Sequence, residues 1–162
     1  MKQYIGLLAI FFFINIVSSQ EDKKVINSIM NQWHKDVANF NFDDYFDKMS
    51  ADGIFIGTDA SENWTITQFK EFAKPFFDKK KTWNFKTLER NIYISKSNGF
   101  AWFDELLDTW MGVCRGSGVL EKENNEWKIK HYVLSVTVPN DDIQKVITAK
   151  KENDKKILVK LK

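Results

Sequence analysis

The sequence has 162 residues, the usual length of one domain. Lysine and arginine number 24 and aspartate and glutamate 22, so the net charge is only +2 and gives no reason to expect nucleic-acid binding. Two histidines and one cysteine without metal-ligand spacing argue against a zinc site, and we expect no metal and no cofactor.

The first 20 residues, MKQYIGLLAIFFFINIVSSQ, have the layout of a secretory signal peptide. Lys2 provides a short positive region, residues 5–17 an apolar one, and Val-Ser-Ser a small-residue cleavage site. The alternative is an uncleaved membrane anchor, but the apolar run is short for a span and Asn15 interrupts it. We therefore expect cleavage after about Ser19, a secreted or periplasmic location, and no stable membrane span afterwards.

Residues 21–39 are predicted to form an amphipathic helix. Its apolar residues recur at helical spacing, and their directions centre close to Trp33. Asp36 lies about 60° from that centre, inside the apolar stripe, whereas His34 lies about 100° away, at the edge. A short helix over 42–49 and a strand over 54–58 are expected next.

The second half of the chain is predicted to contain one helix, then a meander of strands, then a final helix. Thr65-Ile66-Thr67-Gln68 has the form of a capping box for a helix to about residue 77. Three glycines in the third strand of the meander favour a bulge or a sharp bend. The final helix follows Asn140. The expected strands of the meander are 83–95, 100–108, 111–122 and 126–138.

This order of elements predicts an α+β domain, with helices packed on one face of a curved antiparallel sheet. We divide the chain into a signal peptide over 1–20, the domain over 21–140, and a C-terminal helix with a lysine-rich tail over 141–162.

Three stretches resemble the SnoaL-like domain family. FIGTDASENW (55–64) matches its phenylalanine–x–glycine–threonine–aspartate and glutamate–x–tryptophan signature. FAWFDE (100–105) and CRGSGVLEKENNEWKIKHYVLSVTVPN (114–140) resemble its later strands. The resemblance covers residues 25–140 and implies the cone-shaped NTF2-like fold. Relatives include ketosteroid isomerases, scytalone dehydratase and polyketide cyclases, which use a deep apolar pocket and a few acid–base groups. Pure binding modules share the fold, so the resemblance does not settle the function.

Two residues stand out as candidate acid–base groups. His131 and Ser135 are expected on the inner face of the last strand, because the lysines that alternate with that face favour water. His131 is then either a hydrogen-bonded core histidine or a pocket acid or base. A carboxylate in an apolar stripe must be paired or protonated. Asp36 therefore either lies at the border of the stripe and reaches water, pairs with Lys23 or Arg115, or is a pocket carboxylate beside His131.

The opposite face of the last strand is expected to carry Tyr132, Leu134 and Val136. These side chains are too apolar to form a contiguous wet patch. Relatives with this fold often dimerise through that side of the sheet, so we expect a homodimer.

Other candidates could line a pocket or be structural. Arg115 could bind a carboxylate of the protein or of a ligand. Asp104 and Glu105 must point to opposite faces, so one at most enters a cavity. Thr58, Asp59 and Glu62 either form a pocket rim or a plain turn. Two aromatic residues of the predicted helices complete the candidate ligand-binding set, Trp33 and Tyr45.

Two functions remain open after these considerations. The first is an exported module that binds a small apolar or amphipathic molecule in an internal pocket. The second is a cofactor-free acid–base enzyme of the isomerase, dehydratase or cyclase type, with His131 as acid or base, Asp36 as its partner, and Tyr45 and Arg115 stabilising an oxyanion. A weaker third possibility is an accessory dimeric interaction module.

Overall fold

The computed structural model describes residues 3–161, with side chains from Gln20 onward. Met1 and Lys2, part of the predicted signal peptide, lie outside the described residues. The helices are α1 (Gln3–Ala38), α2 (Phe42–Asp47), α3 (Ile66–Asp78), the short 3-10 helix η1 (Asn140–Asp142) and α4 (Ile143–Leu161). The strands are β1 (Met49–Ile56), β2 (Asn63–Thr65), β3 (Lys86–Ile94), β4 (Phe100–Thr109), β5 (Gly112–Glu123) and β6 (Glu126–Val136).

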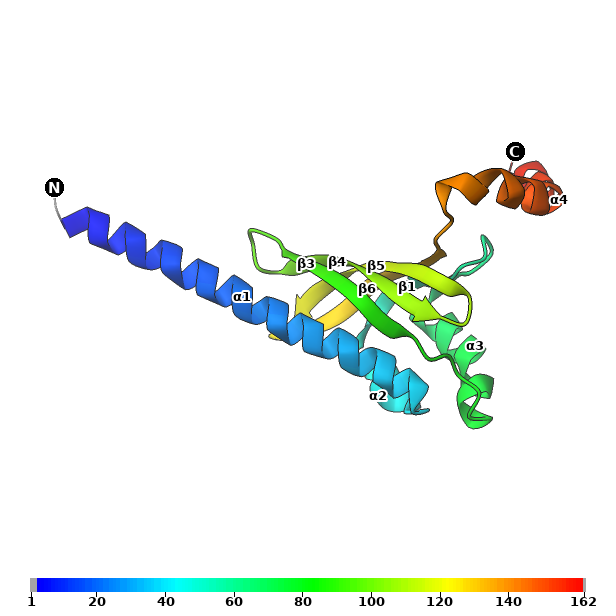
Figure 1. Cartoon of the computed structure of the whole chain (residues 1–162). Coiled ribbons are helices and arrows are strands. Elements are labelled where there is room, and N and C mark those ends of the chain that lie inside the picture. Colours follow the sequence, from blue (N-terminus) through cyan, green and yellow to red (C-terminus); the bar gives the residue numbers. More distant parts are fainter. Residues whose placement is uncertain (1–2, 162) are drawn as a thin grey trace.

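The six strands form one curved, open sheet in the order β2-β1-β6-β5-β4-β3. Strands β3 to β6 form the predicted antiparallel meander. β1, however, lies parallel to β6, so the sheet is mixed rather than wholly antiparallel. The long helix α1 crosses the sheet beside β3, and α3 lies at the other end of the sheet (Figure 1). The predicted α+β architecture with helices packed on a curved sheet is confirmed.

Helix α1 continues without a break from the predicted signal segment into the domain. Its first described contact with the sheet is made by Asp22, which accepts hydrogen bonds from the Trp127 indole at 2.9 Å and from Lys122 at 3.0 Å. From there on, the side chains of Ile26, Met30 and others that face the sheet are fully buried. In the described part of the chain, the helices are too short or too polar to cross a membrane.

The connection from β1 to α3 is built by local hydrogen bonds. Thr65 and Gln68 form the predicted capping box, each side chain bonding the backbone N–H of the other residue. The ring of Trp64, just before the cap, stacks on Phe69 with centroids 5.7 Å apart, as a hydrophobic staple requires.

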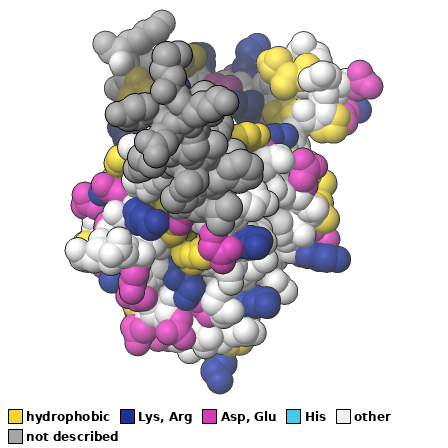
Figure 2. Space-filling model, turned by 90° about the vertical axis from the view of Figure 1, so that its left-hand side faces the viewer, with side chains coloured by type: hydrophobic (Ala, Val, Ile, Leu, Met, Phe, Trp, Pro, Cys, Tyr) yellow, Lys and Arg dark blue, Asp and Glu magenta, His cyan; other side chains and the backbone are white. Residues whose placement is uncertain are grey.

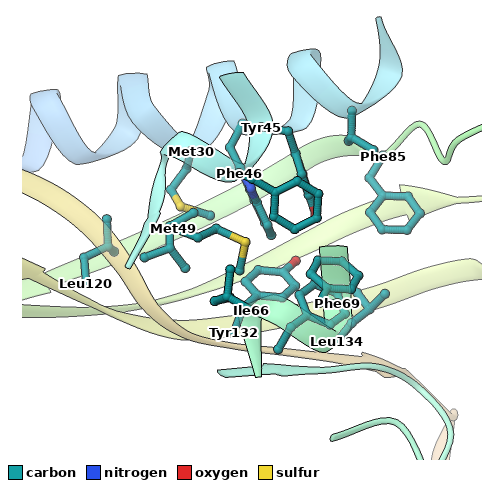
Figure 3. Packing of buried hydrophobic residues seen from close by; sticks show 14 of the residues in the cluster. Met30, Tyr45, Phe46, Met49, Ile66, Phe69, Phe85, Leu120, Tyr132 and Leu134 are labelled. Carbon is teal, nitrogen blue, oxygen red and sulfur yellow. The ribbon is translucent and has the colours of Figure 1, made fainter. Parts of the chain in front are cut away.

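The concave side of the sheet is filled largely by aromatic side chains. Figure 3 shows the rings of Tyr45, Phe69 and Tyr132 gathered between the helices and the sheet. Phe55 from β1 stacks on Phe69 of α3 with centroids 3.9 Å apart. Trp33 of α1 stacks on Tyr45 of α2 at 4.9 Å. Aromatic side chains therefore make up much of the core of the cone.

Strand β6 contains a bulge that overturns the predicted assignment of its faces. Val119 pairs with His131 while the next residue, Leu120, pairs with Ile129, so Lys130 is the extra residue. An extra residue shifts the alternation by one position. Before the bulge, Trp127 and Ile129 point inward; after it the buried side chains are Tyr132 and Leu134.

The prediction that His131 and Ser135 face the inside is therefore wrong, because it assumed strict alternation through the whole strand. The same bulge removes the premise on which a dimer was expected. Tyr132 and Leu134 are core residues and do not form an outer apolar patch.

Helix α4 stands apart from the sheet at the end of a connecting segment (Figure 1). None of its residues is buried, although Ile143, Ile147 and Leu158 give it an apolar stripe. Charged side chains of both signs are interspersed on the face of the molecule in Figure 2, in line with the near-balanced charge.

Candidate functional site

One of the fully buried carboxylates of the core lies on β4. Glu105 is 1% exposed and points to the concave face, between the apolar Phe103 and Leu107 of the same strand. A buried carboxylate is costly unless it is paired and hydrogen-bonded. Its surroundings therefore decide whether it contributes to stability or to function.

Both oxygens of Glu105 have partners from other elements. Oε1 is 2.9 Å from Nε2 of His34 on α1 and accepts a hydrogen bond from the Tyr132 hydroxyl at 3.2 Å. Oε2 accepts two hydrogen bonds from Arg90 on β3, from Nε at 2.9 Å and from Nη2 at 2.7 Å. We call Glu105, His34, Arg90 and Tyr132 the Glu105 cluster. It joins α1, β3, β4 and β6 at one point.

Arg90 is itself saturated with acceptors, and its side chain is only 2% exposed. Nη1 donates to the side-chain oxygens of Asn27 and Asn31 on α1, both at 2.8 Å. Nη2 also donates to the Thr87 hydroxyl at 3.1 Å. All N–H groups of a guanidinium, five in number, can thus be satisfied here. Arg90 therefore fastens α1 to β3.

The protonation of the cluster follows from these contacts. Burial by itself would raise the pKa of Glu105, but the contacts with His34 and Arg90 outweigh it and hold that pKa below its usual value. Glu105 is then an ionised acceptor at neutral pH, so Nε2 of His34 carries the proton of their hydrogen bond. Burial, followed by the charge of Glu105, raises the pKa of the Tyr132 hydroxyl, which stays a neutral donor.

Gly116 on β5 makes room for this arrangement. A Cβ atom at this position would overlap the Tyr132 hydroxyl and lie 2.9 Å from Oε1 of Glu105. The glycine was expected to serve curvature; its position against the cluster shows that it is also needed for close approach.

A cleft of about 470 Å³ lies beside the cluster, between α1 and β3. We call it the α1–β3 cleft. His34 lines it, together with two lysines, Lys35 and Lys86, and the ring of Phe85. Polar side chains complete the lining, which consists of Asn31, Ala38, Asn39, Asn84 and Thr87.

A second depression, of about 140 Å³, lies between the sheet, α3 and the turn between β4 and β5. We call it the aromatic groove. Its walls come from β1, α3, the segment before β3 and the turn between β4 and β5, which supplies Trp110. Glu62 and Thr58 lie at its rim. The apolar lining is Phe55, Trp64, Phe69, Phe72, Trp83, Phe85, Trp110, Met111 and Leu134.

The structure does not bring the two predicted acid–base residues together. His131 lies on the outer face of β6, in register with Val119 and Ile54. Asp36 is buried on the inner side, where Lys48 lies 2.6 Å from Oδ2 and Gln32 donates to Oδ1 at 2.8 Å. Asp36 is thus paired with Lys48, and not with the predicted Lys23 or Arg115.

The other predicted residues separate into three groups. Trp33 and Tyr45 are buried in the core, and burial raises the pKa of Tyr45, with Trp83 opposing it. Asp104 and Arg115 lie on the outer face, 3.6 Å apart, and the exposed Ser135 is in register with Arg115.

The third group is the turn after β1. Asp59 accepts hydrogen bonds from the Ser61 hydroxyl at 2.6 Å and from the Ser61 backbone N–H at 2.9 Å, as in the plain-turn alternative, and these two bonds lower the pKa of Asp59. Thr58 and Glu62 line the aromatic groove.

Sequence reasoning missed the Glu105 cluster, although a signal was present. In β4 the neighbours of Glu105 on its own face, Ala101, Phe103 and Leu107, are apolar, whereas the other face carries Asp104 and Asp108. That pattern favours Glu105 as the inward residue. Arg90, one of two arginines in the chain, was the natural partner to seek. Among the described residues, the structure gathers no group of three or more side chains that could hold a metal ion.

Comparison with solved structures supports the cone-shaped fold. An NTF2-like protein of unknown function from Pseudomonas putida superposes with a TM-score of 0.63 at 10% identity, over 75% of this chain and 91% of that one. The association domain of C. elegans CaMKII gives 0.61 at 16% identity, over 74% and 98%. A ketosteroid isomerase-like protein from Parabacteroides distasonis gives 0.55 at 15%, over 70% and 86%.

These identities are too low to show more than the fold, which is similar to that of the NTF2-like proteins. No curated protein sequence matches the chain. The profile of the SnoaL-like domain matches residues 26–139, which include the Glu105 cluster and the aromatic groove. The chain therefore belongs to the SnoaL-like domain family.

Proposed function

We propose that the protein binds a small apolar or amphipathic molecule in the aromatic groove. The observation that carries this proposal is the exposure of aromatic surface at a concave site: Trp110 lines the groove and is 82% exposed. A contiguous apolar depression of this kind is a default candidate for a binding site.

The shape of the groove limits the ligand. Its volume of about 140 Å³ accommodates about one six-membered aromatic ring, so a larger ligand leaves part of itself outside. Trp64 and Phe72 stack with centroids 4.6 Å apart and present flat faces, which suit a planar guest. Glu62 and Thr58 at the rim offer polar contacts to an amphipathic molecule.

The experiment is a titration with N-phenylnaphthylamine, an apolar probe that fluoresces when it leaves water. Saturable binding is expected, with affinity five- to tenfold weaker in Trp110→Ala, since one lost aromatic contact is worth about 1 kcal/mol. Trp102→Ala is the matched control, because Trp102 is also exposed but stacks on Tyr93 on the outer face of the sheet. Equal loss in both variants, or no saturable signal, contradicts the proposal.

We further propose that the chain is exported after cleavage close to Ser19. The core contacts of α1 are kept in a chain that begins at Gln20, because Asp22 and Ile26 follow the cut. Mass spectrometry of the protein from expressing cells should give the mass of a chain beginning at Gln20. A full-length mass in the membrane fraction would support the anchor instead.

A homodimer through the outer face of the sheet is a third proposal. Tyr93 and Trp102 stack there at 5.7 Å and are 43% and 49% exposed. On the neighbouring strands, Val119 of β5 is in register with Trp102, and His131 of β6 is in register with Val119. The C. elegans CaMKII domain, an association domain by name, has a similar fold. Sedimentation velocity should show a dimer that Trp102→Lys dissociates and Trp110→Lys does not; a monomeric native protein rules it out.

A further inference from the structure

The α1–β3 cleft combines a buried histidine with an unbalanced positive rim. Lys35 on α1 and Lys86 on β3 line it, and both are exposed. Among the described residues that line the cleft there is no aspartate or glutamate. The charge of Glu105 behind His34 is already matched by Arg90. The described lining therefore carries two lysines and no carboxylate, and Asp108 on β4, outside the lining, is the register partner of Lys86.

His34 adds a directed polar atom to this cleft. Its Nε2 is engaged by Glu105, which orients the ring and determines which nitrogen carries the shared proton. The remaining ring nitrogen, Nδ1, has no hydrogen-bond partner in the described part of the chain and is not completely buried. His34 thus meets the cleft with an atom that accepts when the ring is neutral and donates when it is protonated.

We propose that the α1–β3 cleft is a binding site for a small anionic molecule, with the anionic group held between Lys35, Lys86 and Nδ1 of His34. The volume of about 470 Å³ is in the range of ligand sites, and the amides of Asn31 and Asn84 can bond polar parts of the guest. This site is separate from the aromatic groove, although Phe85 lines both.

The charged groups around His34 determine the electrostatic environment of the bound anion. Glu105 on β4 and Arg90 on β3 lie behind the ring and neutralise each other, and Tyr132 on β6 contacts Glu105. The lysines lie on the cleft side. A carboxylate and a phosphate share the chemistry that this arrangement recognises.

Succinate and inorganic phosphate are suitable probes, because neither has an apolar ring that would enter the aromatic groove. The readout is the nitrogen chemical shift of the histidine rings at neutral pH. The chain has two histidines, so His131 on the outer sheet face is an internal control. Titration should shift the Nδ1 signal of His34, which the bound anion would contact, and leave that of His131 unchanged. A response to succinate alone identifies a carboxylate site, and one to phosphate alone a phosphate site.

The variant Lys35→Ala/Lys86→Ala should weaken binding at least tenfold, and both exposed positions allow it to fold. Lys96→Ala/Lys151→Ala removes the same charge from exposed sites elsewhere and should bind like the native protein. The proposal is overturned if neither anion moves the His34 signals, if His131 moves equally, or if both double variants lose the same affinity.

Discussion

The Glu105 cluster and the aromatic groove lie on the concave side of the same sheet. The polar groups of the cluster are hydrogen-bonded within the protein, whereas the aromatic rings of the groove are partly exposed to water. In the cluster, both carboxylate oxygens and the whole guanidinium of Arg90 have partners within the protein. In the groove, Trp110 and Phe72 keep aromatic surface in contact with water. Groups whose hydrogen bonds are all made within the protein cannot bind a ligand without losing those bonds, whereas exposed aromatic surface can bind one. His34 connects the two situations, since one of its nitrogens is bonded inside and the other meets a cleft.

Glu105→Ala should produce the largest change, because it leaves Arg90 as a buried charge without its partner. We expect a loss of about 3–5 kcal/mol in the free energy of unfolding, measured by urea denaturation. Asp104→Ala is the matched control on the same strand: its pair with Arg115 is on the outer face and should cost less than about 1 kcal/mol. Similar losses in both variants would show that the cluster is not a structural centre.

The pH dependence of the cluster gives the next largest effect. Since the pKa of Glu105 is lowered in the folded state, its contribution is present above the usual glutamate pKa of about 4.3 and disappears as the pH falls through the lowered value. The stability difference between the native protein and Glu105→Gln should therefore be constant at neutral pH and shrink in acid. A difference that grows as the pH falls would reverse the assigned direction.

Gly116→Ala tests the close approach of β5 to the cluster. The added methyl group overlaps the Tyr132 hydroxyl and must displace it from Glu105, so we expect a loss of about 1–3 kcal/mol. At Gly99, by contrast, a Cβ atom meets only the Ser97 hydroxyl at 3.8 Å. Thermal denaturation of Gly99→Ala should then be close to native, and an equal loss at both positions would point to a general backbone effect.

Phe72→Ala tests whether the aromatic groove is a binding surface or part of the core. Phe72 is half-exposed and stacks on Trp64, so its removal should cost only about 1–2 kcal/mol while changing probe binding clearly. The fully buried Phe69 beside it should cost about 3–5 kcal/mol when truncated. If Phe72→Ala destabilised as much as Phe69→Ala, the groove would be part of the core and not a binding surface.

Trp110→Ala should have the smallest effect on stability, within about 0.5 kcal/mol, because its side chain lies mostly in water. Urea denaturation checks this directly. Together with the expected loss of probe affinity, an unchanged stability would mark Trp110 as a residue kept for binding. A large loss of stability would instead show that it packs in the fold.

The fold was predictable to the extent that it depends on local patterns. The capping box at Thr65, the staple of Trp64 on Phe69 and the four-stranded meander all follow from residues close together in the chain. The parallel pairing of β1 with β6 was not predictable in this way, because the two strands are far apart in sequence. The same holds for the cluster, since His34 and Glu105 are separated by 71 positions.

The sequence by itself determined the family, the aromatic character of the core and the order of helices and strands apart from the three-residue β2, because periodicity and capping act over a few residues. The tertiary structure decided which side chains meet. One extra residue at Lys130 turned His131 outward and Tyr132 inward, and the pairing of β6 with β5 made that shift. The inward side of β4 placed Glu105 among three partners from three other elements. A face is a property of the assembled sheet, so the candidate site became visible only once the strands were paired.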